Sequence, residues 1–469
     1  MSLSSNGAQH NNRATTRDNE GLFTCEPPRH PSLDRGQTTQ APKSLNPEKV
    51  RRFLEEAKDL ALTFTRETGL APASSPVEKS KAEIPDDALQ QFDNWYRLPE
   101  SQSRLGDFMA SLASKIERFD MRGHPGHDAR HILIQDPLAG LKLVEGIATG
   151  EPITGARRLF LISSMLHDFG RLLEPALGRA DKELESAVAR EHSTMSFAET
   201  QRLLQHSSLS TMPVELKNHI AFATLAHTQG DYPKHPLTQY TTWSDRAQIY
   251  GHEGLLRMLA CDVALKGLAL FPSDPATVNS DRSYGGDDKN MLGHMCYFLR
   301  HGMEFPSRAP LAAVTGRIVY ELVKRTPYEQ QVFPENATDA RAAEYKTCTS
   351  ELPPEVQAKI NALGEQYPLS RLADLACAVT SAPGATPIRE VNASPPNQGL
   401  TGEELLRQKV AEVPAHMRGN LRDALLYALA TRPTTEQETG LDRFLGDPDT
   451  LVRGTAKIIA QAMNRYANT

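Results

Sequence analysis

An apolar helix that ends in a histidine and an aspartate is the feature that most constrains how this chain can fold. Residues 158–171 read Arg-Leu-Phe-Leu-Ile-Ser-Ser-Met-Leu-His-Asp-Phe-Gly-Arg. Because large apolar side chains surround the expected helix, we expect it to be buried. His167 and Asp168 would then be polar groups in the core, where unpartnered charge is costly. They need a partner there, such as a metal ion, unless this end of the helix reaches solvent.

Other possible metal ligands follow at long intervals, each within or at the edge of a separate expected helix. They are His131, His192, His227 and Asp245. Taken singly, each is readily explained as a surface or core side chain, but antiparallel helices can bring such residues to one level of a bundle. Imidazole and carboxylate ligands suit Mn, Fe, Co, Ni, Zn or Mg without selecting among them. The pattern therefore favours a site for a divalent ion, which lowers the pKa of bound water and offsets charge on phosphoryl oxygens.

Composition narrows the classes of partner. The net charge of the 469 residues is −6 at pH 7, so neither nucleic acid nor an anionic membrane surface is an expected partner. The odd number of cysteines, five, and the absence of a CxxC motif argue against a disulfide framework. A small phosphorylated substrate stays compatible with these numbers.

The absence of recognisable targeting signals predicts a cytoplasmic protein. No run of about 18 apolar residues could form a transmembrane helix, and the first ten residues lack the apolar core of a secretory signal. The polar, Ser- and Asn-rich start of the chain is also compatible with the secretion signal of a bacterial effector that acts in a host cytosol. A dispensable tail explains the same composition.

The pattern of the chain predicts an all-α protein, because helix-period segments are broken by Gly and Pro and alternating strands are missing. A first helix is expected from Pro47 to Glu67, with Gly69 at its end and a linker over 71–85. Thr401-Gly-Glu-Glu fits a capping box that opens a later helix. The expected regions are a disordered segment over 1–46, a helix and linker over 47–86, a helical catalytic domain over 87–345, a helical segment with a Pro-rich linker over 346–400, and a small C-terminal helical region over 401–469.

The ordered set of candidate ligands resembles the signature of the HD-domain superfamily of metal-dependent phosphohydrolases, H…HD…D, often extended to H…HD…H…H…D. The matching residues are His131, His167, Asp168, His192, His227 and Asp245. The segment from His167 to Arg171 is similar to the family's HDxG[KR] core, and His227 to Gly230 is similar to an HTxG loop of some nucleotide-hydrolysing members. The resemblance covers about a third of the chain, roughly residues 115–265. It implies an all-helical HD-type bundle.

The resemblance also implies roles for the residues. The primary metal site would be formed by His131, His167, Asp168 and Asp245. His192 and His227 would either hold a second metal, with Asp168 bridging the two ions, or contact the substrate phosphate. Asp168 would thereby take part directly in catalysis.

Residues near these ligands have more than one explanation. Arg171 lies four residues after His167, so a continuing helical turn places it on the same face, where it could bind a phosphoryl oxygen and assist catalysis. A cation favoured by the helix dipole is the alternative. Asp128 could orient His131 or act as an N-cap. His124 and His127 in the preceding Gly/Pro loop could flank the substrate or face solvent.

The expected activity is hydrolysis of a phosphomonoester or phosphodiester, in a nucleotide or a related compound. The HD-GYP enzymes that cleave cyclic dinucleotides carry two adjacent histidines where this chain has only His227, and alarmone hydrolases carry acidic residues where this chain has Phe169-Gly-Arg. Both subgroups are therefore disfavoured. A catalytically degenerate HD-fold binding or effector protein and a di-iron HD-type oxygenase stay open as alternatives. Residues 270–345 match no known motif and are the candidate for a loop that covers the substrate.

Overall fold

The structure is a computed structural model, and all of its regular elements within the described residues are helices. It describes residues 46–116, 130–146, 152–173, 181–258, 262, 268–303, 315, 319, 322–323, 326–333 and 440–467, apart from 74, 80 and 231. One isolated β-bridge joins Ala269 and Asn290. The expected all-α class is confirmed. The expectations of a disordered N-terminal segment and of a Pro-rich linker over 346–400 fall outside the described residues, apart from Asn46.

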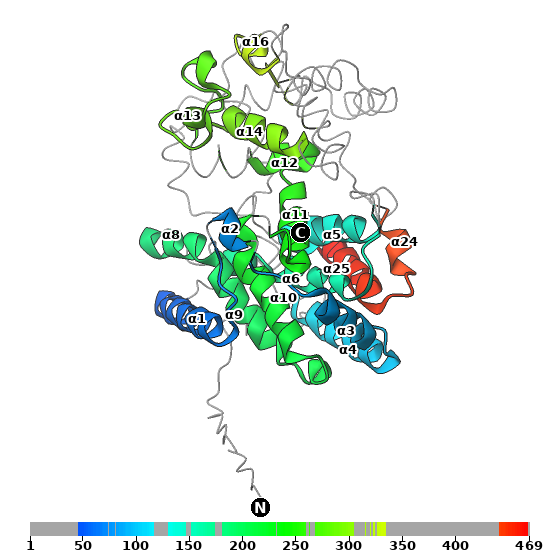
Figure 1. Cartoon of the computed structure of the whole chain (residues 1–469). Helices are drawn as coiled ribbons and strands as arrows, with labels where there is room; N and C mark the ends of the chain where they lie inside the picture. Colours follow the sequence, from blue (N-terminus) through cyan, green and yellow to red (C-terminus); the bar gives the residue numbers. More distant parts are fainter. Residues whose placement is uncertain are drawn as a thin grey trace, which may run out of the picture. The chain divides into compact units, whose positions relative to one another are not determined.

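The elements follow one another as a succession of short and medium helices (Figure 1). In chain order they are α1 (Pro47–Thr68), α2 (Pro76–Lys79), α3 (Asp86–Tyr96), α4 (Pro99–Ile116), the π-helical turn η1 (His131–Gln135), α5 (Asp136–Val144), the 3₁₀ turn η2 (Gly155–Leu159), α6 (Phe160–Leu166), η3 (Phe169–Leu173), α8 (Lys182–Arg190), α9 (His192–Leu204), η5 (Ser207–Leu209), α10 (Val214–Ala226), η6 (His227–Gln229), α11 (Pro236–Ala247), α12 (Gly251–Met258), η8 (Pro275–Thr277), α13 (Asp281–Tyr284), α14 (Met291–Met303), α16 (Glu329–Val332), α24 (Asp442–Leu445) and α25 (Thr450–Ala467). Among the described residues, no helix combines the length and the apolar character that a membrane span requires.

The first helix, α1, begins at the predicted residue, Pro47, and ends at Thr68, one residue after the predicted Glu67. The side chain of Asn46 accepts a hydrogen bond from the backbone N–H of Glu48, and Pro47 occupies the first turn. Gly69 ends the helix with a φ of 73°, in the left-handed region that side chains disfavour. The inner face of α1 packs on α9, where the rings of Phe64 and Phe197 lie 4.9 Å apart. This helix therefore contributes to the same hydrophobic core as the helices that follow it.

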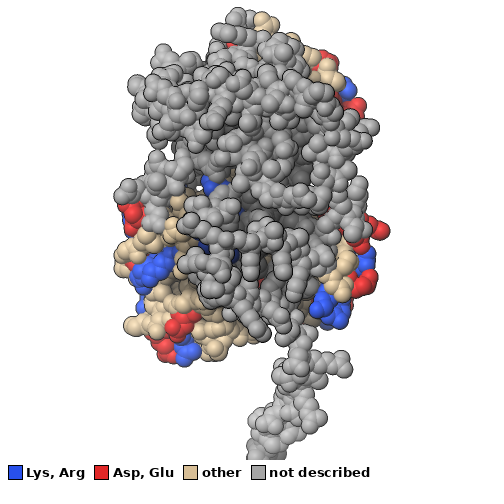
Figure 2. Space-filling view, turned by 180° about the vertical axis from the view of Figure 1, so that it is seen from behind, with Lys and Arg blue, Asp and Glu red and all other residues tan. Residues whose placement is uncertain are grey.

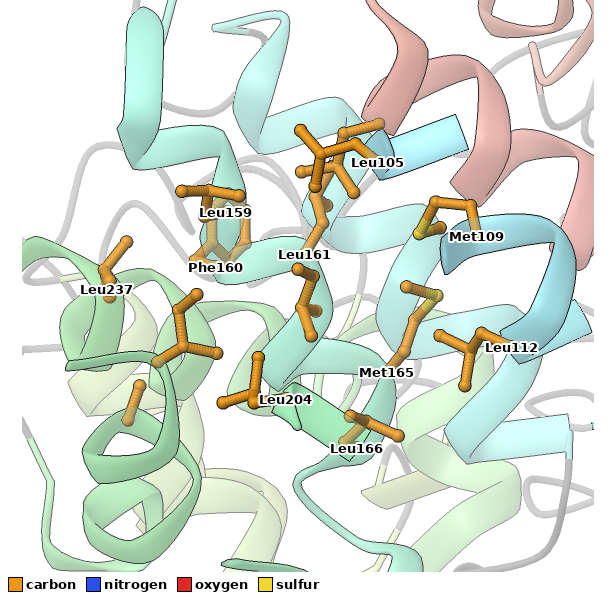
Figure 3. Close-up of a cluster of buried hydrophobic side chains, with 14 of the residues drawn as sticks. Leu105, Met109, Leu112, Leu159, Phe160, Leu161, Met165, Leu166, Leu204 and Leu237 are labelled. Carbon is orange, nitrogen blue, oxygen red and sulfur yellow. The ribbon is translucent and has the colours of Figure 1, made fainter. Parts of the chain in front are cut away.

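The apolar helix that ends in His167 lies at the centre of the fold. Every residue of α6 is buried, and the helix contacts α5, α9, α10, α11 and α25. Figure 3 shows the core around it. The labelled side chains are Leu159 to Leu161, Met165 and Leu166 from η2 and α6, Leu105, Met109 and Leu112 from α4, Leu204 from α9, and Leu237 from α11. Because neighbours cover α6 on several sides, its position and the direction of its last residues are fixed by packing.

The C-terminal helices complete this core. The sequence predicts only that residues 401–469 form a C-terminal helical region. In the described part of this region, 440–467, helix α25 packs on α4, α5 and η1. Leu451 and Ile459 of α25 are fully buried in the same cluster as α6. Just before α25, Asp449 accepts hydrogen bonds from the hydroxyl of Tyr96 at 2.7 Å and from Arg158 at 2.7 Å. The last helix of the chain therefore supports the helices that carry the candidate ligands.

On the face shown in Figure 2, the charged residues among those described do not gather into one patch. On the face shown in Figure 2, the described Lys and Arg residues are interspersed with Asp and Glu residues. This mixture agrees with the small net charge of −6.

Replacing Ile459 by alanine should lower the free energy of unfolding by about 2–5 kcal/mol, because it leaves a cavity in the shared core. The matched control is Leu62→Ala on α1, where the side chain is 70% exposed and the change should stay below about 0.5 kcal/mol. Urea unfolding followed by circular dichroism measures both. Equal, small effects of the two substitutions would show that α25 is not part of the cooperative core.

Candidate metal centre

Five of the predicted ligands form one buried cluster. His131, His167 and Asp168 offer one group of ligand atoms, Asp168, His192 and His227 offer another, and within each group the atoms lie within 4.8 Å of one another. All five residues are buried. The sixth predicted ligand, Asp245, joins the first group, with its Oδ1 3.5 Å from Nε2 of His131. The structure therefore brings together six residues that span more than a hundred positions of the chain, at the ends of several helices.

A π-helical turn positions His131. Residues 131–135 form η1, in which the backbone N–H of Asp136 bonds to the carbonyl of His131, five residues earlier. Pro137 follows, and its ring would clash with a carbonyl four residues before it in a regular α-helix, so the widened turn accommodates the proline. The turn also places Asp136 in the interior, fully buried beside the cluster.

A close approach of two backbones positions Asp168. The chain leaves α6 at His167 and turns through η3, where the N–H of Gly170 donates to Ser196 Oγ at 2.8 Å. A Cβ atom on Gly170 would lie only 2.5 Å from the carbonyl oxygen of His192. Glycine is therefore required at this point, because it lets the start of α9 approach the residues that follow α6.

All four histidines are oriented through Nδ1. In each, Nδ1 faces an oxygen, so Nδ1 carries a proton and Nε2 presents a lone pair in the neutral ring. The acceptors are the carbonyls of Ser164 for His167 at 2.7 Å, of Ala189 for His192 at 2.9 Å and of Thr224 for His227 at 2.7 Å, and the side-chain oxygen of Gln248 for His131 at 3.0 Å. The amide of Gln248 is itself oriented, because its Nε2 donates to Asp136 at 3.3 Å.

The four Nε2 atoms converge on the carboxylate of Asp168, one pair on each oxygen. Oδ2 lies 3.3 Å from His131 and 3.7 Å from His167. Oδ1 lies 3.3 Å from His192 and 3.6 Å from His227. These separations exceed the usual range of an N–H···O bond, about 2.7–3.2 Å. Two ligand atoms that bind one metal ion at bond lengths of about 2.0–2.2 Å lie about 3.1–3.8 Å from each other. All four distances between the Nε2 atoms and the Asp168 oxygens fall in this range.

One buried nitrogen of the cluster supports the same assignment. Within the described residues, Nε2 of His167 has no hydrogen-bond partner although it is fully buried. Such a group is costly unless something compensates for it. The donor set of imidazoles and carboxylates fits a divalent transition metal, so these residues could hold a metal ion.

Asp245 adds a second carboxylate on the side of His131 and His167. Its Oδ1 lies 3.7 Å from Nε2 of His167 and 3.5 Å from Nη1 of Arg257, on α12. Burial alone would raise the pKa of Asp245, but the neighbouring imidazole of His167 and the charge of Arg257 hold it well below the usual value. The carboxyl is therefore ionised and available as a ligand at neutral pH.

Electrostatics distinguish His167 from His192. Burial opposes protonation of His167, but the charges of Asp136 and Asp168 outweigh it and raise the pKa of His167 well above the usual value. The same negative charges favour a metal cation. Burial lowers the pKa of His192 to about 3, against the attraction of Asp168. His192 is therefore neutral at pH 7, which is the form that binds a metal.

Arg171 lies at the edge of the cluster, with its Nε 3.8 Å from Oδ1 of Asp168. Its side chain is 19% exposed and that of Asp245 is 22% exposed, so the otherwise buried cluster reaches solvent beside these two residues.

Three residues of the site were not predicted from the sequence, and three residues that were predicted lie outside the described residues. The missed residues are Asp136, Gln248 and Arg257, which support His167, His131 and Asp245 respectively. A proline directly after Asp136, inside an otherwise helical pattern, is the one sequence signal that could have indicated a widened turn there. The predicted residues that lie outside the described part of the chain are His124, His127 and Asp128.

No protein-family model, curated protein or solved structure matches this chain.

The helix that carries Asp245, α11, is capped by a histidine. Nδ1 of His235 accepts from the backbone N–H of Thr238 at 3.3 Å, so its protonated Nε2 donates to Nδ1 of His219 at 2.9 Å. His235 is fully buried. Burial, together with the neighbouring His219, lowers the pKa of His235 well below the usual value. The cap therefore exists only with a neutral imidazole.

Lowering the pH should destabilise the fold through this cap. Unfolded His235 takes up a proton near its ordinary pKa of about 6.5 and folded His235 does not, so the stability it contributes is present above that pH and is lost as the pH falls, by about 2 kcal/mol between pH 7 and pH 5. Asparagine is also a good N-cap but does not titrate. The stability advantage of the wild type over His235→Asn, measured by urea unfolding, should therefore shrink from pH 7 to pH 5. A difference that is constant with pH would contradict this account.

Proposed function

We propose that this protein is a divalent-metal-dependent phosphohydrolase of the HD type, a phosphomonoesterase or phosphodiesterase that acts on a nucleotide or a related phosphate ester. The observation that carries the proposal is the arrangement around Asp168, whose two carboxylate oxygens face two separate pairs of histidines. This geometry suits a carboxylate that bridges two metal ions. The ordered H…HD…H…H…D pattern in the sequence supports the same assignment.

The two ions would be held by different residues. His131, His167 and Asp245 would hold the first, His192 and His227 would hold the second, and Asp168 would be shared. Divalent ions bound there would lower the pKa of water and offset charge on the phosphoryl oxygens.

The chain's own residues would bind and orient the substrate. Arg171 lies at the solvent-facing edge of the cluster, where its guanidinium could bind a phosphoryl oxygen and stabilise the charge that develops on it. Asp136 lies 3.2 Å from Nδ1 of His167 and accepts from Ser164 at 2.9 Å, which holds that imidazole in place. The buried helices behind the cluster exclude bulk water, so charge–charge interactions there are stronger than at the surface.

Metal content is the first test of this proposal. The double variants His192→Ala/His227→Ala and His131→Ala/His167→Ala should each lower bound Mn²⁺ or Zn²⁺ from two equivalents to one, because each removes one half of the site. His206→Ala, a histidine near η5, is the matched control and should leave the content unchanged. Elemental analysis of the purified proteins gives the number. One equivalent in the wild type would remove the two-metal assignment.

Activity is the second test. A phosphate-release screen with Mn²⁺ against mono-, di- and cyclic nucleotides should find turnover that Asp168→Asn and His167→Ala each lower by at least about 100-fold while the helical circular dichroism survives. A chelator should abolish turnover and added metal should restore it. Retained activity in either variant would defeat the assigned mechanism.

The alternatives give different results in the same experiments. A di-iron oxygenase would contain iron and consume dioxygen with a substrate, and a binding or effector protein would hold metal without turning over any ester.

A further inference from the structure

The segment between α1 and α3 is fixed at both ends to the loop that follows His227. We expected residues 71–85 to be a linker. The N–H of Ala73 instead donates to the hydroxyl of Tyr232 at 2.9 Å, and the N–H of Ile84 donates to the carbonyl of Lys234 at 3.0 Å. Lys234 also forms an ion pair with Glu83 at 2.9 Å. The short helix α2 between these contacts is therefore held over the loop in a defined position.

This segment brings a lysine to the loop. Nζ of Lys79, on α2, donates to the carbonyl of Gln229 and lies 5.8 Å from the ring centre of Tyr232. The guanidinium of Arg246, on α11, lies near the same glycine. A Cβ atom on Gly230 would lie 3.3 Å from Nη2 of Arg246 and 3.4 Å from Nζ of Lys79. The two cationic groups therefore lie within about 7 Å of each other, both beside the space that a side chain on residue 230 would occupy.

No carboxylate among the described residues neutralises either cation. Among the described residues, neither Lys79 nor Arg246 forms an ion pair with a carboxylate. Two like charges this close repel each other unless an anion lies between them. Gly230 leaves the space between them free of a side chain, and its φ of 94° with ψ of −156° is a conformation that only glycine adopts readily. The two cations and the glycine beside them therefore have the properties of an anion-binding site.

The position of this pair relates it to the metal centre. Gly230 follows the candidate ligand His227 by three residues, and Arg246 directly follows the candidate ligand Asp245. An anion held by Lys79 and Arg246 would therefore contact the chain segments that also carry two of the candidate ligands.

We propose that Lys79 and Arg246 form an anion subsite that binds a second phosphate group of the substrate. The link to a substrate rests on the proposed function and narrows it to esters that carry two phosphate groups. The subsite itself does not depend on catalysis, because its two cations are in place without a metal.

Binding of inorganic phosphate to the full chain in the presence of a chelator tests the subsite. In a ³¹P NMR titration of the metal-free protein, Lys79→Met and Arg246→Met should each weaken phosphate binding at least fivefold, because methionine keeps the apolar stem and removes the charge. Lys79→Arg keeps the charge and should retain binding. Lys81→Met is the matched control, since Lys81 is exposed on the same segment, and it should bind as the wild type does.

The outcomes separate the subsite from the hydrolase. Phosphate binding that Lys79→Met weakens and Lys81→Met does not would support the subsite even if no ester is turned over, and in that case only the hydrolase would be rejected. Equal affinities of wild type, Lys79→Met and Arg246→Met would overturn the subsite even if the protein is an active hydrolase. In an active enzyme, Lys79→Met should raise KM for a nucleoside diphosphate at least fivefold and leave KM for p-nitrophenyl phosphate unchanged, and an equal effect on both would overturn the assignment to a second phosphate.

Discussion

The carboxylate of Asp168, buried among four imidazoles, is the constraint on which the rest of the structure depends. Each of its oxygens faces two Nε2 atoms at 3.3–3.7 Å, too far for ordinary hydrogen bonds and suited to ligands of a shared ion. A buried charge in such surroundings is tolerated only when something of opposite charge compensates for it. The fold therefore has to bring several helix ends to one point and hold them there.

The helix ends achieve this by one repeated local device. His167, His192 and His227 each donate Nδ1–H to a carbonyl three residues earlier, at the point where one helical segment gives way to the next. Carbonyls at a helix end have no partner within the helix, so each histidine satisfies one of them and in return has its ring direction fixed. Three rings are thus oriented by their own segments, and the packing of the helices only has to bring those segments together.

His131 and Asp245 depend more on distant parts of the chain. His131 is oriented by Gln248, which is anchored by Asp136, and Asp245 is held by Arg257 on the following helix. The α25 helix packs against η1 and α5, so residues more than three hundred positions away support the turn that presents His131. The segment around α2, expected to be a linker, is tied to the loop after His227 and brings Lys79 beside Arg246. These long-range contacts leave no local signal.

The sequence by itself determined the helical class, the bounds of α1 and the order of the six candidate ligands, because apolar periodicity, proline and glycine at helix ends, and the spacing of His and Asp are local properties. Only the tertiary structure decided that Asp168 presents one oxygen to each histidine pair, that Asp136, Gln248 and Arg257 support the ligands, and that the C-terminal helix completes the core. The reason is physical: directions of side chains and contacts between distant segments are set by how the helices pack, and packing depends on the whole set of buried side chains at once.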